Sequence, residues 1–174
     1  MPEQIEVRRL VGDELHASLD ALAAILVDCV SAGASVGFMA PFSHDDARGY
    51  FDSWAAEADA GGRIILGAFV DGELAGTGQV ILALPPNQPH RGDVAKVLVH
   101  PSARRRGIAA LVMAQAEVEA RAEGRSLLVL DAVSDGDAAR LYARLGWTVV
   151  GVVPNFALFP DGRYCDTTYF YKEI

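Results

Sequence analysis

A mixed α/β sheet is the fold class that this sequence predicts, and two patterns predict it. Two strand-like runs, residues 63–70 and 73–84, are joined by Asp71-Gly72, a pair suited to the positive φ angles of a tight hairpin, so these strands should be antiparallel neighbours. Residues 93–131 then follow the pattern strand, helix, strand, whose two strands (93–99 and 126–131) should be parallel. A sheet with both kinds of pair is mixed.

The N-terminal part of the chain predicts one short strand and two helices. Residues 5–10 form a strand-like run, and apolar residues then recur at helical spacing over residues 15–30, behind Asp13 as the expected N-cap. Ser43 and Asp46 are spaced as a capping box, which predicts that a second helix begins there.

The C-terminal part adds a helix and two strands. Residues 137–145 have a helical pattern, residues 147–153 and 164–171 are strand-like, and the Asp161-Gly162 pair marks the turn between the two strands. No linker, repeat or composition break divides the 174 residues, of which 51% are hydrophobic. Residues 1–174 are therefore expected to form a single domain.

Charge and composition exclude several classes of partner. The formal net charge of −8 argues against a nucleic-acid-binding surface. No stretch approaches the roughly 20 apolar residues of a membrane-spanning helix, and the N-terminus lacks a signal-peptide pattern, so we expect a cytoplasmic protein without a membrane partner. Cys29 and Cys165 fall in apolar stretches with no metal-type spacing, which indicates reduced thiols that pack in the core.

A basic turn between a strand and a helix predicts a phosphate site. Arg104, Arg105 and Arg106 precede Gly107, and the amphipathic helix begins there. N–H groups of a first helical turn converge on one point, the helix dipole favours an anion, and glycine permits close approach. The alternative is a solvated charge run, although arginines at a helix N-terminus oppose the dipole unless an anion lies among them. No G-x-G-x-x-G follows the first strand, and no G-x-x-x-x-G-K-[ST] loop is present.

This turn resembles the acetyl-coenzyme A (acetyl-CoA) motif of the GNAT acetyltransferases. Arg104-x-x-Gly107-x-Ala109 matches their [QR]-x-x-G-x-[GA] pattern. A later segment, Asp135-x-x-Ala138-x-x-x-Tyr142-x-x-x-Gly146-Trp147, is similar to their N-x-x-A-x-x-x-Y-x-x-x-G-F motif, with aspartate in place of asparagine and tryptophan in place of phenylalanine. The resemblance covers roughly residues 5–173. It implies a central mixed sheet of about six to seven strands with four main helices, in which splayed parallel strands hold acetyl-CoA.

The resemblance also implies how acetyl-CoA, as co-substrate, would be held. Backbone N–H groups from Arg105 to Ala109 would bind the pyrophosphate, and Leu98 and Val99 would pair with the pantetheine arm as an added strand does. A backbone N–H near Leu98 is the expected oxyanion donor. The expected cofactor-binding residues are Leu98, Val99, Arg104, Arg105, Arg106, Gly107, Ile108, Ala109 and Asp135.

Asp131 and Tyr142 are the expected catalytic residues. Asp131 lies at the end of the second parallel strand, where a carboxylate can accept the proton of an approaching amine directly or through water. The alternative is that Asp131 caps the helix that follows. By the family pattern, the Tyr142 hydroxyl donates a proton to the leaving thiolate, and the alternative is a tyrosine that only packs in the core.

A loop near the N-terminus predicts the acceptor side of the site. Residues 33–40 and the 101–107 turn are similar to the tabtoxin-resistance acetyltransferases, which acetylate a β-lactam amino acid and in which the aspartate matching Asp131 is assigned as the general base. The resemblance makes Gly37 and Phe38 candidate substrate-binding residues. The cluster of Phe38, Met39 and Phe42 is otherwise typical of a core.

The expected function is N-acetylation of a small-molecule amine, cationic or amino-acid-like, in antibiotic or toxin resistance or detoxification. Acetylation of protein lysines or N-termini is a second enzymatic reading, and a non-catalytic sensor of acyl-CoA is a third, suggested by Asp135. A homodimer is expected by analogy with the superfamily. The four histidines are scattered without metal-ligand spacing, which predicts no metal.

Overall fold

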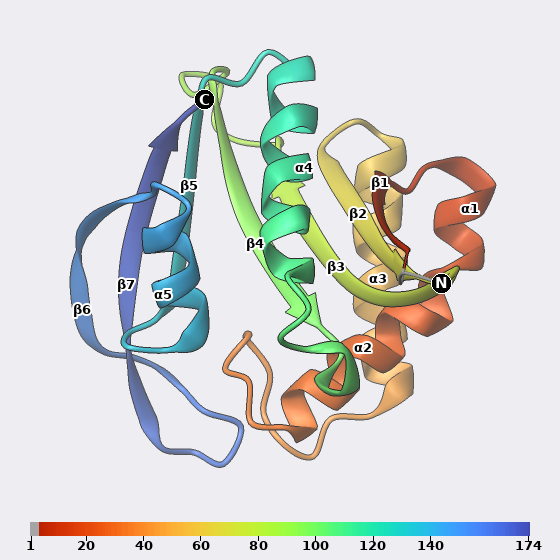
Figure 1. The fold of residues 1–174 in the computed structure, drawn as a ribbon, viewed down its shortest axis with the longest axis horizontal. Coiled ribbons are helices and arrows are strands. Elements are labelled where there is room, and N and C mark those ends of the chain that lie inside the picture. The colour runs from red at the N-terminus through yellow and green to blue at the C-terminus, as the bar shows by residue number, and fades with distance from the viewer. Residues whose placement is uncertain (1–3) are drawn as a thin grey trace.

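A seven-stranded mixed sheet forms the centre of the computed structural model, which describes residues 4–174, and its strand order is β1-β2-β3-β4-β5-β7-β6 (Figure 1). The strands are β1 (Ile5–Arg9), β2 (Arg63–Val70), β3 (Glu73–Ile81), β4 (Arg91–Val99), β5 (Leu127–Val133), β6 (Thr148–Leu158) and β7 (Tyr164–Glu173). The helices are α1 (Gly12–Ala17), α2 (Leu19–Ser31), α3 (His44–Asp59), α4 (Ile108–Ala122) and α5 (Asp137–Arg144), with a short 3₁₀ helix at Pro101–Ala103.

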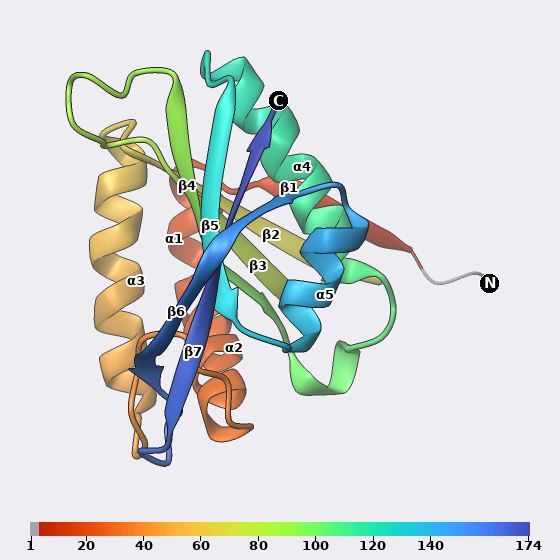
Figure 2. The ribbon, with the colours of Figure 1, turned by 90° about the vertical axis from the view of Figure 1, so that its left-hand side faces the viewer.

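Helices cover both faces of the sheet. The helices α1, α2 and α3 lie on one face, and α4 and α5 lie on the other (Figure 2). Each face has its own apolar core: the first, around Leu22, Leu26 and Phe51, is fully buried under α2 and α3, and the second, around Val112 and Met113, is fully buried under α4. Burial on both faces explains why the central strands are almost continuously apolar in sequence.

The hairpin and the parallel pair that the sequence predicts are both present. Strands β2 and β3 are antiparallel and joined through Asp71 and Gly72, whose φ angles are 49° and 87°. Strands β4 and β5 are parallel and connected by α4. The fold is therefore the predicted α/β class with a mixed sheet.

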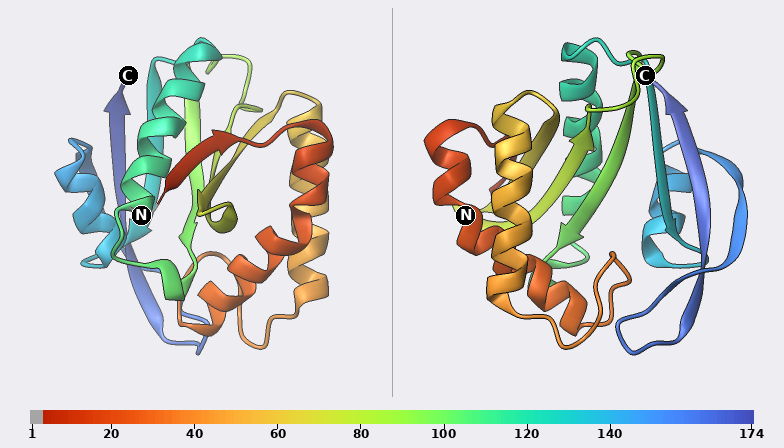
Figure 3. Two further views of the ribbon diagram at one scale, coloured as in Figure 1. Left: turned by 45° about the vertical axis from the view of Figure 1, so that its right-hand side comes forward. Right: turned by 180° about the vertical axis from the view of Figure 1, so that it is seen from behind.

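The two parallel strands separate soon after they pair. Their register includes only Arg91 to Asp93 of β4, opposite Leu127 to Val129 of β5. Beyond that point β4 and β5 diverge, and the loop after α2 lies below the divergence (Figures 1 and 3). We call this divergence the fork.

A bulge in β4 lies within the fork. Thr77 of β3 pairs with Leu98, whereas Gln79 pairs with Ala95, so Lys96 and Val97 together oppose the single residue Gly78. Lys96 adopts a φ of 51° at this bulge. An extra residue bends and twists a strand, which turns β4 away from β5 and leaves that edge of β4 without a partner strand.

The N-terminal helical region differs from the prediction of one helix. Ser18 ends α1 and precedes α2, and its hydroxyl donates to the Glu14 carbonyl at 2.7 Å. A serine that bonds back to the preceding turn competes with the regular helix ladder, and the chain bends there. Asp13 is not the N-cap either, because Val11 occupies that position and makes no side-chain cap bond.

Two further details can be compared with the sequence predictions. The capping box is confirmed, since the Asp46 N–H donates to the Ser43 hydroxyl at 3.1 Å at the start of α3. Strand β6 continues to Leu158, five residues beyond the predicted end at Val153. Pro154 is tolerated because β6 is an edge strand and needs no donor on its open side.

Two observations bear on the predictions made from composition. Cys29 and Cys165 are both buried and unbonded to each other, and burial raises the pKa of the Cys29 thiol. Within residues 4–174, none of the helices has the length and apolar character to cross a membrane.

Candidate active site

The turn before α4 has the geometry of an anion cradle. Gly107 is the N-cap of α4 with a φ of 77°, and Arg105 two residues earlier has a φ of 63°. The Leu111 N–H donates to the Gly107 carbonyl at 3.2 Å, so the N–H groups of Ile108 and Ala109 precede the first helical hydrogen bond. Those groups point out of the helix end, where the helix dipole favours negative charge.

The first arginine of the turn folds back on the sheet. Arg104 donates through Nε to the Val99 carbonyl at 3.3 Å, and its Nη2 lies 3.9 Å from the Cys29 sulfur. The Cys29 thiol also donates to the Val99 carbonyl, at 3.5 Å. Arg104 therefore ties the cradle to the end of β4 and to α2, and the Val99 carbonyl already has two donors within the chain.

The charge of the basic turn reaches the N-terminus of α5. A hydrogen bond and charge from Arg140 lower the pKa of Asp137, the first residue of α5, and the charges of Arg105 and Arg104 add to the effect. The N-termini of α4 and α5 thus flank the same positive region, on the side of the sheet where the fork opens (Figure 2).

The predicted arm-binding strand is the unpaired edge of β4. Leu98 is buried on the α2 side, and Val99 packs partly buried against the α4 core. Beyond Asp93 this edge lacks a neighbouring strand in the described structure, so no strand prevents an extended ligand from pairing with it, although the Val99 carbonyl already accepts from Arg104 and Cys29.

Asp135 lies in the turn between β5 and α5. Its φ is 59°, and its carbonyl oxygen accepts a hydrogen bond of 2.6 Å from Arg140 Nη1. The side chain is exposed. Aspartate and asparagine are the residues that tolerate this left-handed backbone best after glycine, so the replacement of asparagine keeps the turn.

Asp131 does not cap a helix. It lies inside β5, two residues before the strand ends, and its Oδ2 accepts a hydrogen bond of 3.0 Å from the Thr167 hydroxyl of β7. The N-cap of α5 is Gly136, which makes no side-chain cap bond. The capping alternative is therefore wrong. The carboxylate of Asp131 is exposed, and its position is set by the backbone of β5 and by the hydrogen bond from Thr167 of β7.

Tyr142 packs in the core, and its hydroxyl forms no hydrogen bond within the described part of the chain. Its side chain is 5% exposed, and its ring lies 5.9 Å from Phe170 and 6.1 Å from Trp147. Burial, with a further contribution from the charge of Asp131, raises the pKa of Tyr142 to about 12. Within the described part of the chain the hydroxyl has no hydrogen-bond partner, so Tyr142 is a permanently protonated donor beside Asp131 at neutral pH.

The predicted acceptor loop joins the two halves of the sheet. The Ser35 hydroxyl donates to the Leu158 carbonyl at 2.7 Å, and the Ala40 N–H donates to the Pro160 carbonyl at 3.2 Å. The loop after α2 is thereby attached to the hairpin between β6 and β7, across the end of the fork (Figure 3).

Phe38 belongs to an aromatic cluster beside the fork. Its ring stacks on Phe42 at 4.5 Å and meets Tyr50 edge-on at 4.7 Å, while Met39 is 46% exposed. Gly37, with a φ of 99°, faces the same space, since a Cβ built on it would lie 3.5 Å from Lys96 Nζ. Phe38 therefore packs in an aromatic cluster, as the core alternative expects, and its role in substrate binding stays a prediction.

The structure adds residues at the fork that the sequence analysis missed. Lys96 points between the ring of Phe38, 5.5 Å away, and that of Trp54, 5.8 Å away. Behind them, Arg63 donates to Gln79 and to Glu57. A lysine set between the apolar pairs Val94-Ala95 and Val97-Leu98 is the one signal in the sequence that points to this cluster.

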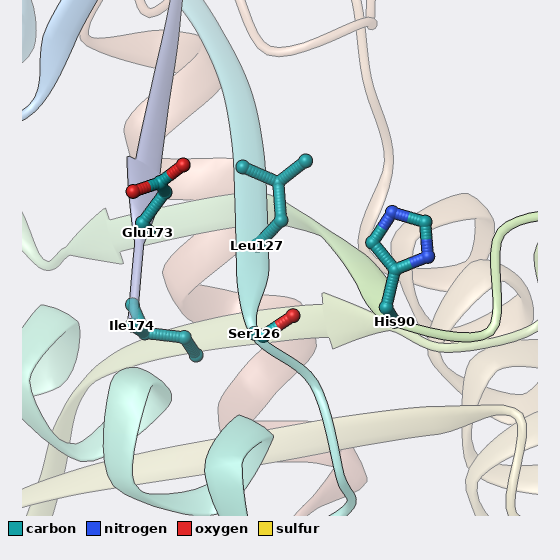
Figure 4. Close-up of a pocket in the computed structure, with 5 residues that line it drawn as sticks. All are labelled: His90, Ser126, Leu127, Glu173 and Ile174. Atoms are coloured by element: carbon teal, nitrogen blue, oxygen red, sulfur yellow. The ribbon is translucent and has the colours of Figure 1, made fainter.

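Open surface depressions occur elsewhere. One is lined by His90, Ser126, Leu127, Glu173 and Ile174, where β5 starts and β7 ends (Figure 4). It lies at the paired end of β4 and β5, away from α5 and the predicted catalytic residues. Across residues 4–174 there is also no cluster of three or more histidine, cysteine, aspartate or glutamate side chains suited to a metal ion.

Comparison with known proteins agrees with this architecture. Residues 22–147 match the model of the acetyltransferase (GNAT) family. The fold is similar to that of an N-acetyltransferase from Staphylococcus aureus Mu50, with a TM-score of 0.80 and 20% identity over 98% of each chain. A Salmonella typhimurium protein named as an acetyltransferase and solved with acetyl-CoA aligns with a TM-score of 0.78 and 21% identity, covering 97% of this chain and 93% of that one. A ribosomal-protein-alanine N-acetyltransferase from Brucella melitensis gives 0.80 and 22%, covering 97% and 99%.

The chain belongs to the GNAT acetyltransferase family, because the family model matches well over half of it. It is an acetyl-CoA-dependent acetyltransferase, and the seven-stranded mixed sheet with its forked parallel pair is the GNAT fold.

Proposed function

We propose that this acetyltransferase transfers the acetyl group of acetyl-CoA to the amine of a small molecule, with residues 1–174 acting as one catalytic domain. The observation that carries the proposal is the position of Asp131, whose exposed carboxylate lies on β5 at the fork and acts electrostatically on Tyr142 and Lys96. A carboxylate in this position attracts an ammonium group and can accept its proton.

The cradle at α4 fits the diphosphate part of acetyl-CoA. The N–H groups of Ile108 and Ala109, the left-handed Gly107 and the basic turn supply donors and positive charge at one helix end. The open edge of β4 would hold the extended arm, and Leu98 lies on that edge. When bound, acetyl-CoA supplies the activated acyl group as a thioester.

Two residues of the chain would then accept and donate the protons of the reaction. Asp131 accepts one proton from the substrate ammonium, which frees the nitrogen lone pair for attack on the acyl carbon. Tyr142 donates a proton to the sulfur as the carbon–sulfur bond breaks, and it regains one when the new amide nitrogen loses its second proton.

The coupling between these residues favours that order. The negative charge of Asp131 is one of the causes that raise the pKa of Tyr142. Once Asp131 has accepted the amine proton, that charge is gone, and burial alone then raises the pKa of Tyr142, which is lower than before the transfer. Tyr142 is therefore a better acid after the base has acted than before.

The test compares two carboxylate-to-amide variants on a panel of amines, with release of free thiol as the readout. Asp131→Asn should lower kcat by about 10²- to 10⁴-fold, whereas Asp161→Asn in the turn between β6 and β7 should not change it. Calorimetric titration with acetyl-CoA should give equal affinity for both variants. Equal rates for Asp131→Asn and the wild type would remove Asp131 from the proton path.

Two other functions remain to be separated by the same assay. A protein acetyltransferase needs an open groove for a peptide, and the attachment of the 32–43 loop to the β6–β7 hairpin favours a small acceptor instead. A peptide array set beside the amine panel distinguishes these. A sensor of acyl-CoA would bind acetyl-CoA without releasing thiol on any acceptor.

The edge of β6 supports the proposal of a homodimer. Strand β6 is at the end of the sheet, and it exposes the apolar side chains of Val149, Val150, Val152, Val153, Phe156 and Leu158. Edge strands of this kind pair readily with a second copy. Analytical ultracentrifugation tests this, and a Val150→Lys variant that stays as associated as the wild type would contradict it.

The biological setting follows from the proposed chemistry. We propose a cytoplasmic enzyme that acetylates an antibiotic, a toxin or a metabolite with an accessible amine, in keeping with the similarity of residues 33–40 to the tabtoxin-resistance acetyltransferases. Expression in a sensitive bacterium with a panel of amine-containing antibiotics tests the resistance role.

A further inference from the structure

A half-buried lysine at the fork has no anionic partner among the residues that the structure describes. Lys96 lies on the bulge of β4 with its ammonium between the rings of Phe38 and Trp54. In the structure as described, from Gln4 to Ile174, it forms neither a hydrogen bond nor an ion pair with a carboxylate. Burial lowers the pKa of Lys96, the charge of Arg63 lowers it further, and the charge of Asp131 opposes both.

A second donor beside Lys96 also has no partner. Gln79 is completely buried, and its Oε1 accepts a hydrogen bond of 2.6 Å from Arg63 Nη1, which fixes the orientation of the amide. The Nε2 group of Gln79 is then left without a hydrogen-bond acceptor among the described residues. A buried donor without an acceptor costs roughly 1–3 kcal/mol, so a ligand oxygen there would relieve it.

The two donors belong to one contiguous group. Gln79 pairs in register with Ala95, the residue before Lys96. The guanidinium of Arg63 lies 5.6 Å from the ring of Trp54, and Lys96 lies against the same ring. Arg63 is 8% exposed and is neutralised by Glu57 at 2.5 Å, so the charge of Lys96 is the one that this group leaves unmatched.

We propose that Lys96, with Gln79 behind it, binds a carboxylate of the acceptor, so that the acceptor is a small molecule with both an amine and a carboxylate. This inference rests on the proposed function, because it names the acceptor class of the same site. The amine is directed to Asp131 on β5, and the carboxylate is directed to Lys96 on β4. The two strands of the fork thereby hold opposite ends of one zwitterion.

Electrostatics favours this acceptor over a simple cationic amine. A plain ammonium compound at the fork would be attracted by Asp131 but repelled by Lys96 at short range. A molecule that carries both charges gains from both residues, and it replaces the missing partners of Lys96 and Gln79. Gly37 leaves room directly above Lys96 Nζ, which a side chain at that position would fill.

The kinetic test uses matched pairs of acceptors, each an amino acid and the amine that results from its decarboxylation, with thiol release as the readout. The wild type should have the higher kcat/KM for the amino acid of each pair. Lys96→Met should lower kcat/KM for the amino acids by about 10- to 100-fold. Its kcat/KM for the decarboxylated amines should be unchanged or higher, so the variant should no longer prefer the amino acid of each pair. Lys96→Arg, which keeps the charge, should restore part of the preference.

The control uses the other lysine of the chain, since Lys96 and Lys172 are the only two. Lys172 pairs with Glu117 on the α4 side and takes no part in the proposed site. Lys172→Met should keep the preference for amino acids. An equal loss on both members of each acceptor pair in Lys96→Met, or no loss on either, would overturn the carboxylate site.

A binding experiment separates this proposal from the proposed catalysis. N-acetyl amino acids, in the presence of coenzyme A, should protect Lys96 from an amine-directed label while Lys172 still reacts, as read by mass spectrometry. The matching N-acetyl amines without a carboxylate should not protect it. Absence of protection by the carboxylates refutes the site at Lys96, whereas protection without turnover on any amine refutes the catalytic proposal and leaves the carboxylate site standing.

Discussion

Ionisation of Tyr142 should make the folded protein lose stability at alkaline pH. The pKa of Tyr142 is raised from the ordinary 10.0 to about 12 in the folded state. A raised folded pKa contributes stability that is complete below the unfolded pKa and is lost as the pH rises through the folded one, here between pH 10 and about 12. Two pKa units correspond to about 2.7 kcal/mol in all, of which roughly 1.4 kcal/mol is lost by pH 11.

Tyr142→Phe isolates this contribution. The ring keeps its contacts with Trp147 and Phe170, and the hydroxyl that is removed has no hydrogen-bond partner among residues 4–174. At pH 8 the free energies of unfolding of the two proteins should therefore agree to within about 0.5 kcal/mol. At pH 11 the variant should be the more stable by about 1.4 kcal/mol, because phenylalanine cannot ionise in the unfolded chain.

The assay is urea unfolding of both proteins at pH 8 and pH 11, followed by tryptophan fluorescence. Asp131→Asn is an informative third protein, because it removes the charge that adds to the pKa of Tyr142, and its own alkaline loss should be smaller. If the difference between the wild type and Tyr142→Phe is the same at both pH values, the phenol ionises normally in the folded state and the reasoning fails.

The catalytic consequence of the same pKa is measurable separately. Tyr142→Phe should lower kcat by about 10²- to 10⁴-fold without changing the affinity for acetyl-CoA. Because the phenol stays protonated up to about pH 12, the wild-type kcat should not decline with an apparent pKa near 10. A full-rate Tyr142→Phe enzyme would show that the residue only packs in the core.

Three further predictions follow from the backbone and the basic turn. Gly78→Ala should destabilise the protein by about 1–3 kcal/mol in urea unfolding, because the new Cβ would lie 2.5 Å from Val112 Cγ1. Gly49→Ala, in α3 with open space around it, should instead stabilise the protein by about 1 kcal/mol. Equal effects of the two substitutions would contradict the packing argument. Gly107→Ala forces a left-handed φ of 77° on alanine, which costs about 1–2 kcal/mol. The substitution should therefore weaken acetyl-CoA binding in calorimetry. An unchanged affinity would show that the α4 turn is not part of the binding site. Arg104→Ala should weaken acetyl-CoA binding and reduce the salt dependence of that binding. Arg121→Ala, near the other end of α4, should change neither. Identical titrations of the two variants would show that the basic turn has no role in binding.

Local patterns predicted most elements of the fold. The Asp71-Gly72 hairpin, the capping box at Ser43 and the strand–helix–strand unit depend on residues that are neighbours in the chain, and all three are present. The errors have a common cause. Ser18 divides the first long helix through the hydrogen bond from its hydroxyl to the Glu14 carbonyl. Strand β6 continues beyond Pro154 because it is an edge strand. Neither feature changes the periodicity of the sequence.

Tertiary structure decided the surroundings of Asp131 and Tyr142. The sequence left a cap and a general base as alternatives for Asp131, and only the structure, which places Asp131 inside β5 and Gly136 at the N-cap of α5, removed the cap. The sequence also predicted Tyr142 from a motif, but the burial that raises its pKa comes from Phe170 and Trp147, which only the packing of α5 against β7 assembles.

The sequence by itself determined the family and the basic turn that we propose as the phosphate cradle, because Arg104 to Ala109 form one contiguous segment whose conformation is set by Gly107 and by the helix that follows. Only the tertiary structure decided what surrounds the fork, where we propose that the acceptor binds. Lys96, Gln79 and Phe38 come from three separate segments, and the register of β3 against a bulged β4, together with the folding back of the loop after α2, brings them together. Such contacts depend on distances between segments, which no local pattern encodes.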